Sequence, residues 1–363
     1  MSGTPIPVAV LTGFLGAGKT TLLNFLLKDP ALANAAVIIN EFGDIGIDHL
    51  LVEHSTDNVV EMASGCLCCT IRGELVGTMH DLLARRDSGG VKPFDRIVIE
   101  TTGLADPAPV LHSVMSEPTL LIRCQLEGVI TVVDAANGMA TLDAHAEAVK
   151  QVAVADRIVL TKVDLLSGRE GEDALFAIIG RLRKLNPAAR LLTTHRNEAT
   201  AARLFNMGLF DPSRKSPDVR GWLAAEAHET GEKRHRHNGH DVSRHDAHIR
   251  SFSFTEEQPI SASGLELFLE LLKSFHGVNM LRMKGIVKVA DDPGRPVVLH
   301  GVQHVFHPPI RLERWPDGDH RTRLVFIIKD VEKPAIKELF RAFTDQIGGG
   351  AAAFADKTLS LNR

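Results

Sequence analysis

A glycine-rich segment near the start of the chain has the spacing of a phosphate-binding P-loop. Gly13 is followed by four residues and then by Gly18, Lys19 and Thr20, between an apolar run and a helical pattern. In such a loop, backbone N–H groups close around phosphate oxygens, the lysine reaches the β- and γ-phosphates, and the threonine ligates Mg²⁺. We therefore predict a nucleoside triphosphate site. Its expected residues are Gly13, Phe14, Leu15, Gly16, Ala17, Gly18, Lys19, Thr20 and Thr21.

A carboxylate that could take part in catalysis lies at the end of a later apolar run. Residues 97–99 lead into Glu100, and Gly103 follows three residues later. A carboxylate at a strand tip beside a P-loop can hold Mg²⁺ through its water shell or orient the attacking water. Gly103 can offer its backbone N–H to the γ-phosphate, because no side chain blocks the approach. We expect Lys19 and Glu100 to be catalytic, and Thr20 and Glu100 to hold Mg²⁺.

A third segment can select the base of the nucleotide. The run 158–160 is followed by Thr161, Lys162 and, two residues later, Asp164. The Asp164 carboxylate can accept hydrogen bonds from the N1–H and N2–H₂ edge of guanine, and adenine has no such pair of donors. The usual GTPase motif has asparagine where this chain has Thr161, so the hydroxyl is kept and the amide is lost. We expect weaker guanine binding with retained selectivity; the alternative is an ordinary exposed loop.

Three cysteines stand within four consecutive residues, at Cys66, Cys68 and Cys69. Their thiolates can converge on one soft or borderline metal ion, for which Zn²⁺ is the first choice and Co²⁺ the second. Glu41 follows another expected strand and can complete a tetrahedral site, although a capping or turn role is equally open. The alternative for the cysteines is a set of reduced core thiols. Cys124 stands apart and is expected to be a packing residue.

Elements in the first half of the chain must position these groups. Six short apolar runs are the expected strands: Val8–Leu11, Val37–Ile39, Arg96–Ile99, Val129–Val133, Ile158–Leu160 and Arg190–Leu192. Their alternation with longer helical segments is typical of a doubly wound, mostly parallel α/β sheet. Ligands in such sheets bind beyond the carboxyl ends of the strands. We therefore expect the P-loop, Glu100 and Asp164 at one edge of the sheet.

A second, smaller unit follows a break in this pattern. Its expected elements are a strand around Phe252 and Phe254, a helix over Leu265–Leu272, strands over Met280–Val289, Val297–Phe306 and Leu324–Ile328, and a helix over Lys333–Phe343. This order predicts a small α+β domain, in which helices cover one face of an antiparallel sheet. The expected domain boundaries are 1–210 for the P-loop domain, 211–249 for a linker and 250–363 for the C-terminal domain.

The expected linker is rich in histidine. Its histidines are His228, His235, His237, His240, His245 and His248. Neutral imidazoles could collect a divalent metal loosely, and a solvated, partly basic linker is the equal alternative.

Bulk composition narrows the class of protein. The net charge of −4 gives no reason to expect a nucleic-acid or anionic-membrane partner. Apolar runs stay well short of the ~20 residues of a transmembrane helix, and the N-terminus lacks the pattern of a signal peptide. Four cysteines, three of them clustered, suit a reducing compartment. We expect a cytoplasmic protein.

Taken together, these motifs resemble those of the CobW-like GTPases, a group that includes the eukaryotic zinc-regulated metallochaperone GTPases. The matching segments are Gly13–Thr20, Asn40–Gly43, Cys66–Cys69, Glu100–Gly103, Thr161–Asp164 and a smaller C-terminal domain after a histidine-rich stretch. The most specific mark is the cysteine cluster between the P-loop and Glu100. The resemblance spans nearly the whole chain, and Thr161 is its main departure.

The resemblance implies a GTPase of the metallocentre-assembly type, similar to the urease and hydrogenase nickel-insertion GTPases. It implies that Cys66, Cys68 and Cys69, with Glu41 as a further candidate, bind the cargo ion. It also implies that the loop after the last cysteine lies near the nucleotide, where Thr70 and Arg72 could contact it. The expected activity is GTP hydrolysis with GTP and Mg²⁺, coupled to transfer of Zn²⁺ or Co²⁺ to a client metalloprotein.

Three alternatives stay open at this point. One is a cobalt or iron insertase for a single enzyme, such as a cobalamin-pathway chelatase or nitrile hydratase. Another is an ATP-using small-molecule kinase whose cysteines form a structural zinc site, and the third is a zinc store or sensor. The sequence names no client and leaves a homodimer open.

Overall fold

The protein is described by a computed structural model that covers residues 5–40, 59–62, 69–195, 198–205 and 248–348. At residues 40, 59–62, 69–72 and 345–348 only the backbone is described. The segment of Glu41, Cys66 and Cys68 and the histidine-rich stretch 211–247 lie outside these ranges. The expected linker and domain boundaries therefore stay predictions.

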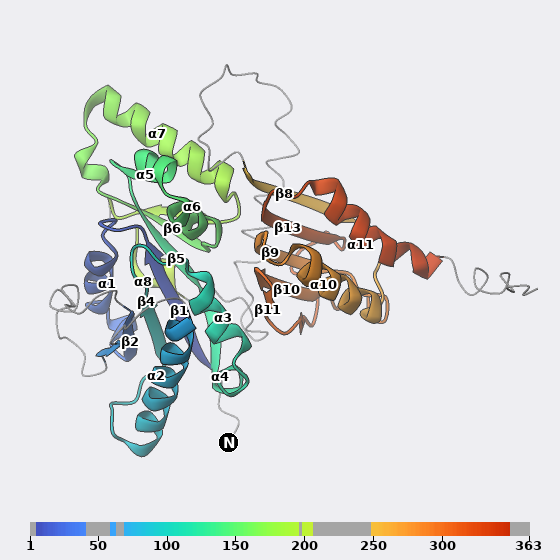
Figure 1. Cartoon of the computed structure of the whole chain (residues 1–363), viewed down its shortest axis with the longest axis horizontal. Coiled ribbons are helices and arrows are strands. Elements are labelled where there is room, and N and C mark those ends of the chain that lie inside the picture. Colours follow the sequence, from blue (N-terminus) through green and yellow to red (C-terminus); the bar gives the residue numbers. More distant parts are fainter. Residues whose placement is uncertain (1–4, 41–58, 63–68, 196–197, 206–247, 349–363) are drawn as a thin grey trace, which may run out of the picture.

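The first unit is built on a seven-stranded parallel sheet, in the order β3-β2-β4-β1-β5-β6-β7 (Figure 1). Its strands are β1 Ile6–Gly13, β2 Ala35–Asn40, β3 Val59–Met62, β4 Arg96–Glu100, β5 Cys124–Asp134, β6 Arg157–Thr161 and β7 Arg190–Thr193. All six predicted strands are present. The prediction missed β3, a four-residue strand that stands at the edge of the sheet among the described strands, next to β2. So short a run carries little periodic signal.

Helices cover both faces of this sheet, which confirms the doubly wound class. They are α1 Lys19–Leu27, α2 Cys69–Ser88, α3 Ala108–Ser116, α4 Pro118–Arg123, α5 Gly138–Ala144, α6 Ala146–Ala153, α7 Gly168–Leu185 and α8 Ala201–Leu204. Alternate residues of β1 point to opposite faces, as the pleat requires. Val8 and Val10 pack in the core with α2 and α3, whereas Ala9 and Leu11 pack in the core with α1 and α8.

The second unit is an antiparallel sheet in the order β11-β10-β9-β13-β8, with β12 beside β10. Its elements are β8 Ile249–Glu256, α10 Ala262–His276, β9 Met280–Val287, β10 Val297–Val302, β11 Val305–Phe306, β12 Ile310–Arg311, β13 Thr322–Lys329 and α11 Lys333–Gly348. Helices α10 and α11 cover one face through an aromatic core around Phe254, Phe268, Phe326 and Phe340. The predicted α+β class is confirmed.

One predicted strand was wrong in its extent. The run Val297–Phe306 is a hairpin of β10 and β11, in which Val302 pairs with Val305. Gln303 turns the chain with a φ of 51°, in the left-handed region. The apolar residues on both sides of the turn hid it, because glutamine is not a usual turn residue.

The second face of the antiparallel sheet packs on the first unit. Helices α3 and α6 lie between the two sheets (Figure 1). Val302 and Val305 join the core of α3, and Leu281 and Ile327 pack on Ala153 at the end of α6. The central strands of this sheet are therefore buried on both faces, and apolar clusters cross from one unit to the other.

A buried charge cluster also crosses this interface. Asp156, just before β6, accepts hydrogen bonds from Arg282 at 2.5 Å and from Lys284, both on β9. Burial alone would raise the pKa of Asp156, but Arg282 and Lys284 outweigh it and hold this pKa far below its ordinary value. Because all three side chains are nearly inaccessible, the cluster fixes how the two units meet.

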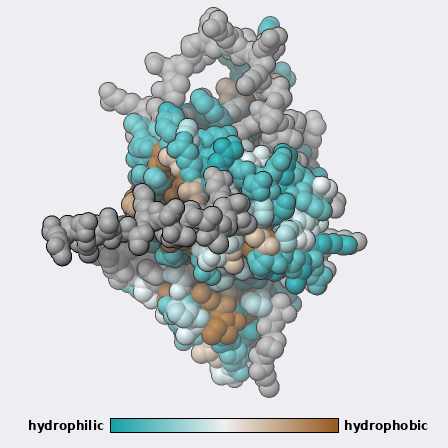
Figure 2. Space-filling model, turned by 90° about the vertical axis from the view of Figure 1, so that its right-hand side faces the viewer, coloured by the Kyte–Doolittle hydropathy of each residue, from teal (hydrophilic) through white to brown (hydrophobic). Residues whose placement is uncertain are grey.

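The outer surface of the C-terminal unit is mostly hydrophilic, with small separate hydrophobic patches (Figure 2). Large apolar side chains exposed on this unit include Leu267, Phe275 and Val278. Within the described ranges, each helix is too short or too polar to span a bilayer.

Candidate functional site

The P-loop leaves the carboxyl end of β1 and leads into α1, the context that a phosphate cradle needs. Gly13, Gly16 and Gly18 have φ values of 148°, 73° and 92°, which favour glycine. A Cβ on Gly13 would also lie 2.3 Å from the carbonyl oxygen of Val132 on β5, so only glycine fits there. Gly18 caps the N-terminus of α1, where backbone N–H groups attract anions.

The predicted Mg²⁺ ligands Thr20 and Glu100 meet at the N-terminus of α1, beside Lys19, which with Glu100 was predicted to be catalytic. The hydroxyl of Thr20 donates to Glu100 Oε1 at 2.8 Å, and both side chains lie at the carboxyl edge of the sheet. A hydroxyl and a carboxylate in contact beside a phosphate cradle are the oxygen ligands that Mg²⁺ takes in P-loop proteins, so these residues fit the ion. Lys19 is buried and its Nζ donates to the carbonyl of Phe14 at 3.3 Å, across the loop it is expected to serve.

Gly103 packs directly on the P-loop. A Cβ at this position would lie 2.6 Å from both N and Cα of Leu15, so the contact needs glycine. The neighbouring Thr101 donates from its hydroxyl to that of Thr12 at 2.8 Å, which ties the end of β4 to β1. The loop after Glu100 is therefore held against the backbone that is expected to surround the γ-phosphate.

A pocket of about 350 Å³ opens on the other side of the P-loop. Its lining consists of Gly18, Thr21, Leu22, Phe25, Thr161, Lys162, Asp164, Thr194 and Ala199. It brings the expected base-reading residues together with the start of α1. The sequence analysis missed Thr194 and Ala199, which follow β7; the only available signal was their place after a strand end.

Thr161 uses its hydroxyl to support the P-loop. It donates to the carbonyl of Ala17 at 2.7 Å and lies 3.3 Å from the carbonyl of Val133. The usual motif has an asparagine here, whose side-chain amide could donate to the P-loop. The shorter threonine hydroxyl still makes a hydrogen bond to the P-loop, so Thr161 supports this loop without an amide group.

Lys162 ties the same loop to β5. Its Nζ donates to the carbonyl of Gly16 and to Asp134 Oδ2, both at 2.8 Å. Burial alone would raise the pKa of Asp134, but hydrogen bonds from Asn137 and Lys162 outweigh it and lower this pKa. Asp134 and Asn137 were missed from sequence, although Asp134 directly follows the predicted strand Val129–Val133 and ends β5 beside the P-loop.

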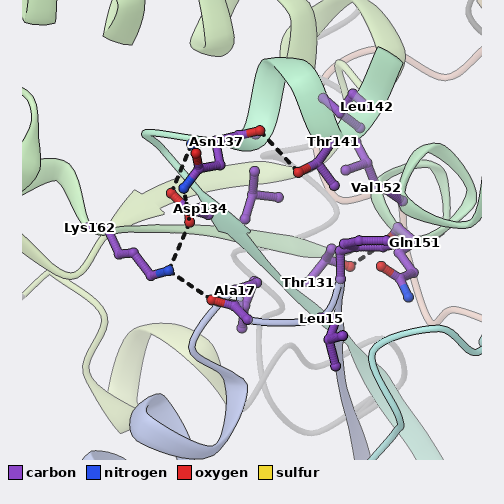
Figure 3. A pocket seen from close by; sticks show the side chains of 16 residues that line it. Leu15, Ala17, Thr131, Asp134, Asn137, Thr141, Leu142, Gln151, Val152 and Lys162 are labelled. Atoms are coloured by element: carbon purple, nitrogen blue, oxygen red, sulfur yellow. Dashed lines mark hydrogen bonds and ion pairs between the residues drawn. The ribbon is translucent and has the colours of Figure 1, made fainter. Parts of the chain in front are cut away.

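A second cavity, of about 290 Å³, lies behind the P-loop (Figure 3). Leu15 and Ala17 form one wall. Asn137, which caps α5, Thr141 on α5 and Gln151 on α6 approach from the opposite side. Sequence reasoning gave no signal for this cavity, because α5 and α6 carry no motif.

The metal site predicted from the cysteines lies outside the described residues. Glu41, Cys66 and Cys68 are not described, and for Cys69 only the backbone at the start of α2 is described. Where side chains are described, no three His, Cys, Asp or Glu residues form a group that could hold a metal ion. Cys124 is buried in the core, as predicted, and burial raises the pKa of its thiol to about 11, so it stays protonated.

The flanks of the predicted metal site are described, and they converge. Strands β2 and β3 are parallel neighbours, and Asn40 at the end of β2 is paired with Met62 at the end of β3. Asn40, which precedes Glu41, and Met62, which precedes the segment 63–68, therefore lie on adjacent strands about 5 Å apart. Both residues lie at the sheet edge that carries the P-loop.

A P-loop that leads into a helix N-terminus, a Thr–Glu pair that fits Mg²⁺ and an adjoining pocket, all at the carboxyl edge of a parallel sheet, define a P-loop nucleotide-binding protein. Residues 7–193 match the family model described as "CobW/HypB/UreG, nucleotide-binding domain". Residues 249–344 match the "Cobalamin synthesis protein cobW C-terminal domain". The chain belongs to the CobW/HypB/UreG family of P-loop GTPases and carries the CobW C-terminal domain.

Similar proteins are named zinc chaperones. The chain is 31% identical to "Zinc chaperone YjiA" of Escherichia coli, over 93% of this chain and 98% of that protein. It is 32% identical to "Zinc chaperone CobW" of Pseudomonas aeruginosa, over 93% and 91%. A crystal structure of the Zn(II)-bound YjiA GTPase from E. coli superposes with a TM-score of 0.67 at 27% identity, over 94% of this chain and 99% of that one.

Proposed function

We propose that this protein is a GTP-hydrolysing zinc chaperone, in which Cys66, Cys68 and Cys69 with Glu41 bind Zn²⁺ for transfer to a client metalloprotein. The main support is the pairing of Asn40 with Met62 on adjacent strands. The segment with Glu41 follows Asn40, and the segment with the proposed cysteine ligands follows Met62. Three thiolates and one carboxylate satisfy the tetrahedral preference of Zn²⁺. The names of the relatives favour zinc over the cobalt alternative.

The proposed substrate is GTP rather than ATP. Asp164 lines the pocket beside Gly18 and Thr194, where its carboxylate can accept from the donor edge of guanine. The support that Thr161 gives to Ala17 explains how the pocket keeps its shape without the usual asparagine. This placement favours a GTPase over the kinase alternative.

Hydrolysis would depend mainly on positioning and charge. Lys19 would hold the β- and γ-phosphates, and Gly103 would donate its backbone N–H to the γ-phosphate. Thr20 and Glu100 would hold Mg²⁺, which when bound neutralises charge on the phosphates. The carboxylate of Glu100 would also orient the attacking water.

Nucleotide and cargo would be coupled through the common sheet edge. The strand order β3-β2-β4-β1 places the ends of β3 and β1 three strand spacings apart, about 14 Å. Segments that leave β2 and β3 can therefore respond to the γ-phosphate and its Mg²⁺, as in other GTPase switches. A 100-fold change in Zn²⁺ affinity needs a coupling of only about 2.7 kcal/mol. Hydrolysis would then weaken the site and release the ion to the client.

Competition titrations of Zn²⁺ against a chromophoric chelator test this proposal. We expect the tightest binding with a non-hydrolysable GTP analogue and weaker binding with GDP or without nucleotide. Replacing Cys66, Cys68 and Cys69 together by serine should abolish the tight site, whereas the buried Cys124→Ser control should retain it. Equal affinities in all three nucleotide states would refute the coupling, and tight binding by the triple variant would refute the site.

A further inference from the structure

Gln151 on α6 is a buried side chain that makes contacts to the loop after Glu100. Only 1% of the residue is exposed. Its Nε2 donates to the carbonyl of Gly103 at 3.2 Å and to that of Ala105 at 3.1 Å. One amide group thus fixes two carbonyls of a single loop, residues 101–107, which we call the Gly103 loop. Two such bonds on neighbouring carbonyls determine the path of the backbone between them.

The position of Gln151 is itself fixed by the sheet. Thr131 on β5 donates from its hydroxyl to the backbone carbonyl of Gln151 at 2.7 Å. On the other side, the Gly103 loop rests on the backbone of Leu15 with no room for a side chain. Gln151 therefore connects β5 to the P-loop by way of Gly103, without reaching the phosphate cradle itself.

The neighbouring ion pair offers a comparison. Lys150 Nζ lies 2.8 Å from Asp106 Oδ2 in the same loop, but the two side chains are 36% and 28% exposed. Such a partly solvated pair contributes little to positioning, since water can replace either partner. The two adjacent residues of α6 thus hold the same loop, one from the interior and one from the surface.

The acceptor end of the Gln151 amide, unlike the donor end, contributes nothing to holding the Gly103 loop. Oε1 is buried, and no described residue donates a hydrogen bond to it. Gln151 lines the cavity behind the P-loop together with Leu15 and Thr131 (Figure 3). The loop is therefore held by the donor end alone, and the effect of losing that donor can be tested with side chains of similar length.

From this geometry we infer that Gln151 is a positioning residue for GTP hydrolysis, which aims the backbone N–H of Gly103 at the γ-phosphate. The inference rests on the proposed function. Gly103 would contact phosphate only when a γ-phosphate is present, so Gln151 should affect turnover of GTP and leave GDP binding unchanged. A displacement of a donor by about 1 Å can cost on the order of 100-fold in rate.

The test compares Gln151→Met, Gln151→Glu and the matched control Lys150→Met in the full chain. Both Gln151 variants keep the side-chain length but lose the two N–H donors. We expect each to lower kcat by about 10- to 100-fold with a GDP dissociation constant within about 2-fold of wild type. Lys150→Met should stay within about 3-fold of wild type in both quantities.

Two results would overturn the inference. One is turnover by both Gln151 variants at the rate of Lys150→Met. The other is an equal loss of GTP and GDP affinity, which would indicate general damage to the fold. If the wild-type chain itself hydrolyses no GTP, the proposed function fails and the positioning role fails with it. Rapid wild-type turnover with equally rapid variants would reject the positioning role alone.

Discussion

The two ends of the neighbouring strands β5 and β6 carry charge clusters of similar composition and different accessibility. At the carboxyl end, the side chains of Asp134 and Lys162 form an ion pair that is 10% and 38% exposed. At the opposite end, Asp156 pairs with Arg282 and Lys284, and none of the three side chains is more than 8% exposed. One cluster lines two pockets, and the other is sealed between the two units.

The pKa values do not separate the two clusters. Both Asp134 and Asp156 have lowered pKa values, although hydrogen bonds outweigh burial in the first case and cationic neighbours outweigh it in the second. Accessibility does separate them, because a ligand can only bind charges that it can reach. A perturbed carboxylate is therefore evidence for a site only when it also lines a cavity.

The largest effect is expected from breaking the sealed cluster. Asp156→Ala would leave Arg282 and Lys284 buried without their carboxylate, and would also remove the acceptor for the backbone N–H of Val129. Loss of one partner from a buried pair costs about 3–5 kcal/mol of unfolding free energy. Urea denaturation of the full chain measures it.

Matched variants sharpen this first comparison. Asp134→Asn should cost less than about 1 kcal/mol, because water can solvate the half-exposed Lys162. Replacing Asp156, Arg282 and Lys284 together by Asn, Met and Met should recover most of the loss, since no uncompensated charge then remains. Equal losses for Asp134→Asn and Asp156→Ala would contradict the distinction between the two ends.

The sequence could predict one of these ends far better than the other. The P-loop, Glu100 and the Thr161–Asp164 segment are short motifs that follow strand ends, so their meeting at one edge follows from the parallel sheet. The partners of Asp156 lie 126 and 128 residues away on a different sheet. No local pattern reports such a pairing, because it depends on how two finished units pack.

The same reasoning explains the remaining misses. Strand β3 is too short to show periodicity, and the turn at Gln303 lacks the residues that usually mark a hairpin. Gln151 carries no motif either: its role arises because α6 crosses the Gly103 loop. The metal ligands remain predictions, and what the structure adds is the adjacency of Asn40 and Met62.

An intermediate effect is expected at the accessible end, on binding rather than on stability. Thr161→Val keeps the shape of the side chain but removes the donor to the carbonyl of Ala17. We expect GTP and GDP affinities to fall together by about 5-fold, which is ~1 kcal/mol, because the P-loop serves both nucleotides. Thr161→Ser keeps the hydroxyl and should bind as wild type. Fluorescent-nucleotide titrations measure both, and unchanged affinity in Thr161→Val would assign the P-loop support to other contacts.

The smallest effect concerns the pH dependence of the sealed end. His300 on β10 is 2% exposed, and burial, with Arg282 nearby, holds its pKa well below the ordinary value. Its neutral form is thus favoured in the folded protein, whereas the unfolded chain gains a proton near pH ~6.5. Stability from this group is therefore present above about pH 6.5 and is lost as the pH falls below it.

Between about pH 7.5 and about pH 6, His300 should account for a loss of about 0.8 kcal/mol of unfolding free energy. His300→Gln removes the ionisable group, so the difference between variant and wild type isolates its contribution from those of the other histidines. Urea denaturation at the two pH values measures this difference. The carboxylate of Asp156 stays ionised over this range, because its pKa is lowered. If wild type and His300→Gln lose stability in parallel, a proton can reach His300 in the folded protein, and the sealed end is open to solvent after all.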